Sequence, residues 1–228
     1  MKIWGITSMI DIKQQEEMFI ALGNILAKKI VVYAIGGTAM MLRGIKDSTL
    51  DIDLVFDKKG DRDKFIFSLK QLGAKDFDET VVYGLKNNIP VMLKLGDARF
   101  DLFLNKIISS TFSDKMKERA NQSHEFGKNL IIKPSNFHDI IIMKCVTSRT
   151  KDWEDITSII MKNDINWDII IDEAQQQVNL GNESAILLLG EKLEKLNNEK
   201  IIYIHKQILD KLWEMLKEQI NKKKITKK

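Results

Sequence analysis

Short apolar runs alternate with amphipathic stretches over the first hundred residues. Apolar side chains recur at helical spacing over 12–29, and IVVYAI (30–35) is then a β-branched run typical of a buried strand. A short helix is predicted over 38–43, followed by a strand at TLDIDLVF (49–56), where apolar and polar residues alternate. A helix over 65–72 precedes three further predicted strands, at TVVYGL, IPVMLKL and RFDLFLN. This order predicts a mixed β-sheet with helices.

The apolar period changes from two to 3.6 residues after about residue 106, which indicates an all-helical portion. Ser135 is the predicted N-cap of its first helix, FHDIIIMKCV. Further helices are predicted at 153–161, 167–178, 184–196 and 199–220. We therefore expect an α+β fold with a first domain at 1–110, a helical domain at 111–220 and a disordered basic tail at 221–228.

Composition places the chain among ordinary globular proteins, since 44% of its 228 residues are hydrophobic and 30% are charged. The single cysteine, Cys145, lies in an apolar run, so we expect a buried neutral thiol and a reducing compartment. The apolar stretches are too short to cross a bilayer, and no signal-peptide segment is evident. These features predict a cytoplasmic protein without a membrane partner.

The net charge of +4 comes from the end of the chain. The last twelve residues, KEQINKKKITKK, carry six lysines and one glutamate, which leaves the remainder at −1. We interpret this segment as a solvated terminus, and contact with RNA phosphates is the alternative.

Two aspartates in the predicted strand TLDIDLVF carry the first candidate chemistry. Asp51 and Asp53 are two residues apart and therefore share one face of the strand, where their repulsion costs roughly 1–3 kcal/mol. A divalent cation turns that repulsion into attraction, and Mg²⁺ prefers such oxygen ligands. The alternative is that both carboxylates form the hydrated face of an edge strand. Asp101 interrupts a later strand and supplies a third carboxylate, the set expected when two metal ions flank a phosphoryl group.

The glycines between the first two strands favour the metal interpretation. Gly36 and Gly37 end a strand just before a helix, where free backbone N–H groups and the positive end of the helix dipole attract phosphate. The same stretch, GGTAMMLRG, lacks the spacing of a dinucleotide-binding fingerprint.

The order of Gly-Gly-Thr, Asp-x-Asp and a later aspartate resembles the minimal nucleotidyltransferase superfamily, which has a polymerase-beta-like fold. The resemblance implies a palm domain in which the glycines and Thr38 hold a nucleoside triphosphate. It also implies that the Asp-x-Asp pair binds Mg²⁺ (or Mn²⁺) and that Asp101 helps to bind metal and to activate an acceptor hydroxyl. Thr49 fits the pattern, whereas Lys46 stands where relatives often carry arginine.

A second block, MKCVTSRTKDWEDI (143–156), resembles the abortive-infection toxin nucleotidyltransferases and their prokaryotic relatives. The resemblance implies that Lys144 and Arg149 face the nucleotide phosphates while Asp152 and Asp155 brace the site. The alternative is that Lys144, Arg149 and Asp152 form an internal ion-pair network that ties the two domains together.

Together these features predict a Mg²⁺-dependent nucleotidyltransferase that moves a nucleoside monophosphate from a nucleoside triphosphate to an acceptor hydroxyl. An RNA end, particularly of tRNA, is the first candidate acceptor, followed by a protein hydroxyl and a small molecule. The resemblance also allows a toxin–antitoxin component with an antitoxin partner. The competing hypothesis is a catalytically inactive protein of the same fold that binds a nucleotide or a partner.

Overall fold

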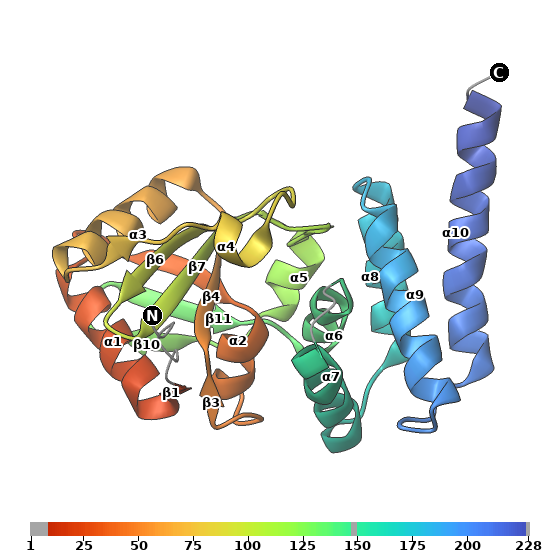
Figure 1. Cartoon of the computed structure of the whole chain (residues 1–228), viewed down its shortest axis with the longest axis horizontal. Coiled ribbons are helices and arrows are strands. Elements are labelled where there is room, and N and C mark those ends of the chain that lie inside the picture. The colour runs from red at the N-terminus through yellow and green to blue at the C-terminus, as the bar shows by residue number, and fades with distance from the viewer. Residues whose placement is uncertain (1–8, 147–149, 227–228) are drawn as a thin grey trace, which may run out of the picture. The chain divides into compact units, whose positions relative to one another are not determined.

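The computed structural model describes residues 9–146 and 150–226. It separates into two compact units, which are both visible in Figure 1. The described residues up to Ile107 form the first unit together with Lys117–Ser135, and the second unit comprises Ile108–Met116 and the described residues from Asn136 onward. The predicted α+β class, with a mixed sheet and a C-terminal helical part, is confirmed. The predicted domain boundaries near residues 110 and 220 stay a prediction.

A mixed sheet is the frame of the first unit. Its strands lie in the order β10 (His124–Phe126), β11 (Leu130–Pro134), β2 (Ile30–Ala34), β4 (Asp51–Phe56), β7 (Ala98–Leu104), β6 (Val91–Leu95) and β5 (Lys75–Asp76). The β11–β2 and β4–β7 pairs are parallel, and the other neighbours along this path are antiparallel. The short strand β8 (Lys106–Ile107) also pairs with β7, while β1 (Ile10–Asp11) pairs with β3 (Ser48–Thr49) in a separate ladder.

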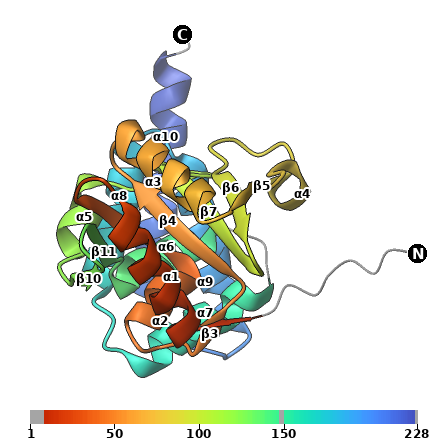
Figure 2. The same cartoon turned by 90° about the vertical axis from the view of Figure 1, so that its left-hand side faces the viewer.

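Two helices, α1 (Ile12–Ile25) and α3 (Lys59–Gln71), cover one face of this sheet, which Figure 2 shows from their side. Asp11 and Gln14 form a capping box that fixes the start of α1. The core lies between these helices and the strands, where the rings of Phe56 and Phe65 meet at 5.2 Å. Each fully buried side chain of this kind stabilises the fold by about 1.5–3 kcal/mol.

The strand predicted at TVVYGL is wrong, because α4 (Thr80–Tyr83) is a short helix. Asp78 accepts hydrogen bonds from both the backbone N–H and the hydroxyl of Thr80, and Gly84 ends the turn with a φ of 60°. The β-branched residues that suggested a strand are exposed, so no neighbouring strand buries them.

Strands β10 and β11 were missed by the helical interpretation of everything after residue 106. Their signal is weak because they are three and five residues long. β11 nevertheless alternates in burial, with Leu130 and Ile132 inside, and it pairs in parallel with β2. The short helix α5 (Asp114–Arg119) and the strand β9 (Ser110–Thr111) precede them.

The second unit consists mainly of helices: α6 (Phe137–Cys145), α7 (Thr150–Lys162), α8 (Trp167–Asn179), α9 (Glu183–Asn198) and α10 (Lys206–Thr226). The N-cap of α6 is Asn136 and not Ser135, whose hydroxyl instead donates to the carbonyl of Ala34 at 2.7 Å. The last helix starts later than predicted, since Lys200 has a φ of 58° just after α9, and it extends into the basic segment expected to be disordered. No helix in the described part of the chain is long and apolar enough to span a membrane.

Candidate active site

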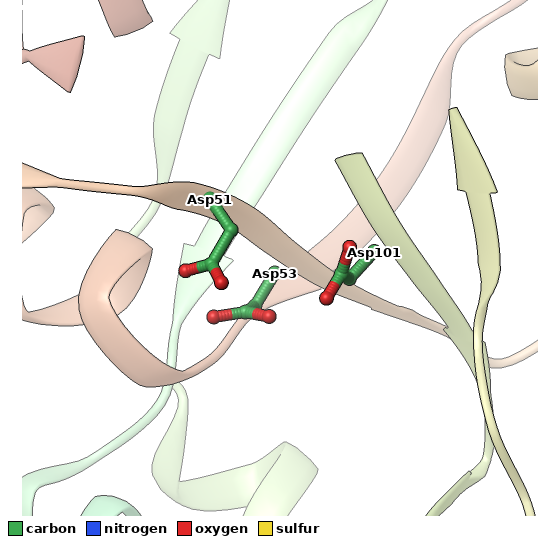
Figure 3. A group of neighbouring side chains, drawn as sticks. All are labelled: Asp51, Asp53 and Asp101. Atoms are coloured by element: carbon green, nitrogen blue, oxygen red, sulfur yellow. The ribbon is translucent and has the colours of Figure 1, made fainter. Parts of the chain in front are cut away.

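Asp51, Asp53 and Asp101 converge on one face of the sheet. β4 and β7 run parallel with Asp53 directly opposite Asp101, so both strands present these carboxylates at the same level. One oxygen from each of the three side chains lies within 4.8 Å of the others. Figure 3 shows the three neighbouring carboxylates. The alternate residues of β4, including Phe56, point to the face that α3 covers. The sequence prediction that the three carboxylates lie together agrees with this geometry.

Arg99 is the cation of the cluster, and sequence reasoning gave it no role. Its Nε donates to Asp101 Oδ1 at 2.9 Å, and its Nη2 contacts Asp101 Oδ2 at 3.2 Å and also Asp51 Oδ2. Burial alone lowers the pKa of this guanidinium, but the carboxylates of Asp101 and Asp51 outweigh it and raise the pKa. Arg99 therefore stays charged and offsets part of the negative charge of the cluster.

Tyr83 closes the other side of Asp101. Its hydroxyl donates to Asp101 Oδ2 at 2.7 Å, and its ring meets Phe103 edge to face at 6.2 Å. Asp101 is fully buried, and this burial raises the pKa of its carboxyl to about 6, although Arg99 and Tyr83 act in the opposite direction. The sequence did not indicate that Tyr83 lies beside Asp101, because this tyrosine belongs to the segment that was predicted as a strand.

The Gly-Gly turn touches the carboxylates directly. Gly36 has a φ of 55°, and a Cβ at this position would lie 2.6 Å from Asp53 Oδ2. A Cβ on Gly37 would lie 2.3 Å from the hydroxyl of Thr49. Both glycines are thus required for the close approach of helix α2 (Gly36–Leu42) to β3 and β4.

Thr38 has a structural role that the sequence did not predict. Its buried hydroxyl accepts a hydrogen bond from the Asp53 N–H at 2.9 Å and donates to the Asp51 carbonyl at 3.4 Å. It therefore fixes the backbone that carries both aspartates. Thr49 is buried beneath Gly37, and Lys46 is half-buried in the loop between α2 and β3. Contacts of these residues with a nucleotide stay a prediction.

Lys144 lies in the second unit, in an ion-pair cluster. Its Nζ contacts Asp152 Oδ1 at 2.8 Å and Asp155 Oδ2 at 2.7 Å, and all three side chains are buried. Burial lowers the pKa of this ammonium, but the two carboxylates outweigh the effect, and the net pKa is raised. The Lys144–Asp152 pair of the predicted network is thus present, with Asp155 in addition. A link between the two domains, a part for Arg149 in it and a contact of Lys144 with phosphates stay predictions. Arg149 lies outside the described residues.

The buried thiol predicted for Cys145 is confirmed. Burial raises its pKa to about 12, so it is protonated at neutral pH. This cysteine therefore has none of the thiolate character of a nucleophile.

The donor set fits a hard divalent cation. Three carboxylates supply the oxygen ligands that Mg²⁺ and Mn²⁺ prefer. A divalent metal ion bound beside the glycine turn would hold a phosphorylated substrate next to a carboxylate that accepts a proton.

A mixed sheet that carries a carboxylate triad beside a glycine turn is an arrangement suited to phosphoryl or nucleotidyl transfer. The chain belongs to a family described as nucleotidyltransferases of unknown function, DUF6036, which matches residues 12–189. No curated protein matches the chain.

Two solved structures are similar to this chain. One is the solution structure of the antibiotic-resistance factor ANT(2'')-Ia, with 16% identity, a TM-score of 0.38 and coverage of 74% of this chain and 85% of that chain. The other is the crystal structure of ANT(2'')-Ia in complex with adenylyl-2''-tobramycin, with 14% identity, a TM-score of 0.38 and coverage of 72% and 87%. The resemblance to toxin-type nucleotidyltransferases stays a prediction.

Proposed function

We propose that this protein transfers a nucleoside monophosphate from a nucleoside triphosphate to an acceptor hydroxyl. Family membership supports nucleotidyl transfer, and the convergence of Asp51, Asp53 and Asp101 within 4.8 Å is the observation that carries the proposal. These carboxylates would hold Mg²⁺ or Mn²⁺, which supplies charge neutralisation at the phosphates.

The residues of the chain then orient the two substrates. The backbone N–H groups of the Gly36–Gly37 turn would hold phosphate oxygens beside Asp53, and Thr38 keeps the aspartates of β4 in place. The acceptor oxygen attacks the α-phosphorus in line, its proton passes to Asp101, and the bond to pyrophosphate breaks. A carboxyl with a pKa near 6 is ionised at neutral pH and is a stronger base than an ordinary aspartate.

The acceptor we propose is an RNA end, particularly of tRNA, with a protein hydroxyl as the next candidate. The lysine-rich segment at 217–228 supports RNA, because lysines attract the phosphate backbone. Lys144 and Arg149 are proposed to assist at the nucleotide phosphates, and a toxin–antitoxin role with an antitoxin partner follows from the resemblance alone.

The test is label transfer from each α-labelled nucleoside triphosphate to total RNA in the presence of Mg²⁺. The wild-type protein is compared with Asp51→Asn and with the matched control Asp47→Asn, which changes an exposed aspartate four residues earlier. We expect transfer by the wild type and the control and none by Asp51→Asn. Nucleotide binding without transfer to RNA or protein would instead favour the inactive binding protein.

A further inference from the structure

The carboxylate oxygens that a metal ion needs are already in contact with donors of the protein itself. Arg99 donates to both oxygens of Asp101 and contacts Asp51 Oδ2, while the Tyr83 hydroxyl also donates to Asp101 Oδ2. The Arg99 side chain is 17% exposed and that of Asp101 is 0% exposed, so water screens this pair weakly. The guanidinium and a metal ion therefore compete for the same ligands.

Charge explains why a cation is present in the metal-free protein. Three carboxylates within 4.8 Å repel one another strongly at a buried site, and a single guanidinium reduces their total charge from −3 to −2. Arg99 is suited to this task because it stays charged and its planar fork reaches two side chains at once. A divalent cation neutralises the cluster more completely, yet it would meet repulsion from a guanidinium that remained between Asp51 and Asp101.

We propose that Arg99 is a positioning residue that holds the carboxylate triad in place until it is exchanged for the divalent metal ion. In the metal-free state its guanidinium keeps Asp51 and Asp101 turned toward a common point. When the metal binds, the side chain leaves these oxygens, so metal binding includes the free energy of breaking the Arg99 contacts. This inference rests on the proposed function, because it concerns the same triad.

The first test compares Mn²⁺ affinity of the wild type, Arg99→Met and Arg99→Lys at neutral pH, measured by electron paramagnetic resonance of free Mn²⁺. Methionine keeps much of the side-chain volume and removes the charge, whereas lysine keeps the charge. We expect Arg99→Met to bind Mn²⁺ about tenfold more tightly than the wild type, or about 1.4 kcal/mol, and Arg99→Lys to remain close to the wild type. A purely structural role predicts the opposite, since loss of a packing residue does not tighten metal binding.

A second measurement uses the wild-type protein and so does not depend on the folding of a variant. The Arg99 Nε–H, bonded to Asp101, is followed by ¹⁵N nuclear magnetic resonance during titration with diamagnetic Mg²⁺. We expect its signal to shift to the position of a solvated guanidinium. A signal that stays unchanged while Mg²⁺ binds, or Mn²⁺ affinity of Arg99→Met equal to or weaker than that of the wild type, would overturn the proposal.

The experiments distinguish failure of the proposed nucleotidyl transfer from failure of the proposed exchange of Arg99 for the metal ion. Label transfer to an acceptor together with unchanged Mn²⁺ affinity in Arg99→Met removes the role of Arg99 and keeps the enzyme. Tighter Mn²⁺ binding by Arg99→Met without label transfer keeps the exchange and removes the activity. If neither the wild type nor Arg99→Met binds Mn²⁺, with or without nucleoside triphosphate, the proposed exchange of Arg99 for the metal ion is wrong, whatever the result of the activity assay.

Discussion

Replacing Gly36 with alanine tests how closely the glycine turn and the acidic cluster depend on each other. Gly36 has a φ of 55°, a conformation that costs a residue with a Cβ about 1–2 kcal/mol. The new methyl group would also lie 2.6 Å from Asp53 Oδ2, so that carboxylate has to rotate away from its present position. Gly44 provides a matched control, because its φ is 70° and nothing lies within 4 Å of a Cβ placed there.

Each variant is expected to lose about 1–2 kcal/mol of unfolding free energy in a urea titration because of its positive φ, and Gly36→Ala should lose more because its methyl group also displaces the Asp53 carboxylate. Only Gly36→Ala should also bind Mn²⁺ at least tenfold more weakly, because only its methyl group displaces a metal ligand. Equal Mn²⁺ affinity in the two variants would show that Asp53 does not depend on the turn. A loss of metal affinity in Gly44→Ala would show that destabilisation of α2, and not displacement of a metal ligand, weakens Mn²⁺ binding.

Three further predictions concern buried charges. Lys144→Met should destabilise the protein by about 3–5 kcal/mol, because Asp152 and Asp155 would remain buried without this ammonium; a urea titration that finds less than about 1 kcal/mol contradicts the pairing. The Mn²⁺ affinity of the wild type should fall as the pH drops below about 6, because Asp101 must lose its proton to bind metal. Folding raises the pKa of the Asp101 carboxyl. Without metal, this group therefore stabilises the folded state at low pH, and the stabilisation is lost as the pH rises from about 3.9 through about 6. Asp101→Asn should remove this dependence of the unfolding free energy on pH. If the variant keeps the dependence unchanged, another group causes it.

Part of the acidic cluster was predictable because local patterns determine which residues of a strand share a face, whereas the position of Asp101 beside the pair was implied by the family resemblance and depends on the β4–β7 register. Alternation along TLDIDLVF places Asp51 and Asp53 on one face, and the same rule places Asp101 opposite to Phe100 on its own strand. The glycines were informative for a similar reason, since two adjacent glycines before a helix indicate a close backbone approach, which the contacts to Asp53 and Thr49 show.

The partners of the cluster were predictable only in part. Alternation places Arg99 on the same face as Asp101, two residues away, but its contact with Asp51 and the position of Tyr83 depend on register and on a short helix. Arg99 reaches Asp51 because these residues are directly opposite in the β4–β7 ladder, and no single-strand pattern contains that register. Tyr83 reaches Asp101 from a helix whose sequence, TVVY, has strand-like residues. There, the two hydrogen bonds from Thr80 to Asp78 favour a turn, although valine has a high β-propensity.

The segment AIGGT serves the fold and the site at once, which determines how variants in it should be interpreted. The Ile35 N–H donates to the Asp53 carbonyl at 3.1 Å, and the Thr38 hydroxyl accepts from the Asp53 N–H at 2.9 Å, so the turn is bonded to the backbone on both sides of this aspartate. Gly36 then contacts the Asp53 carboxylate itself. Because the same residue is held through its N–H, its carbonyl and its side chain, a change in the turn alters the aspartate even when the nucleotide never touches the substituted residue. Loss of activity in a Thr38 variant is therefore consistent with a misplaced Asp53, and only a variant with normal Mn²⁺ affinity and weaker nucleotide binding would support a direct contact between Thr38 and the nucleotide.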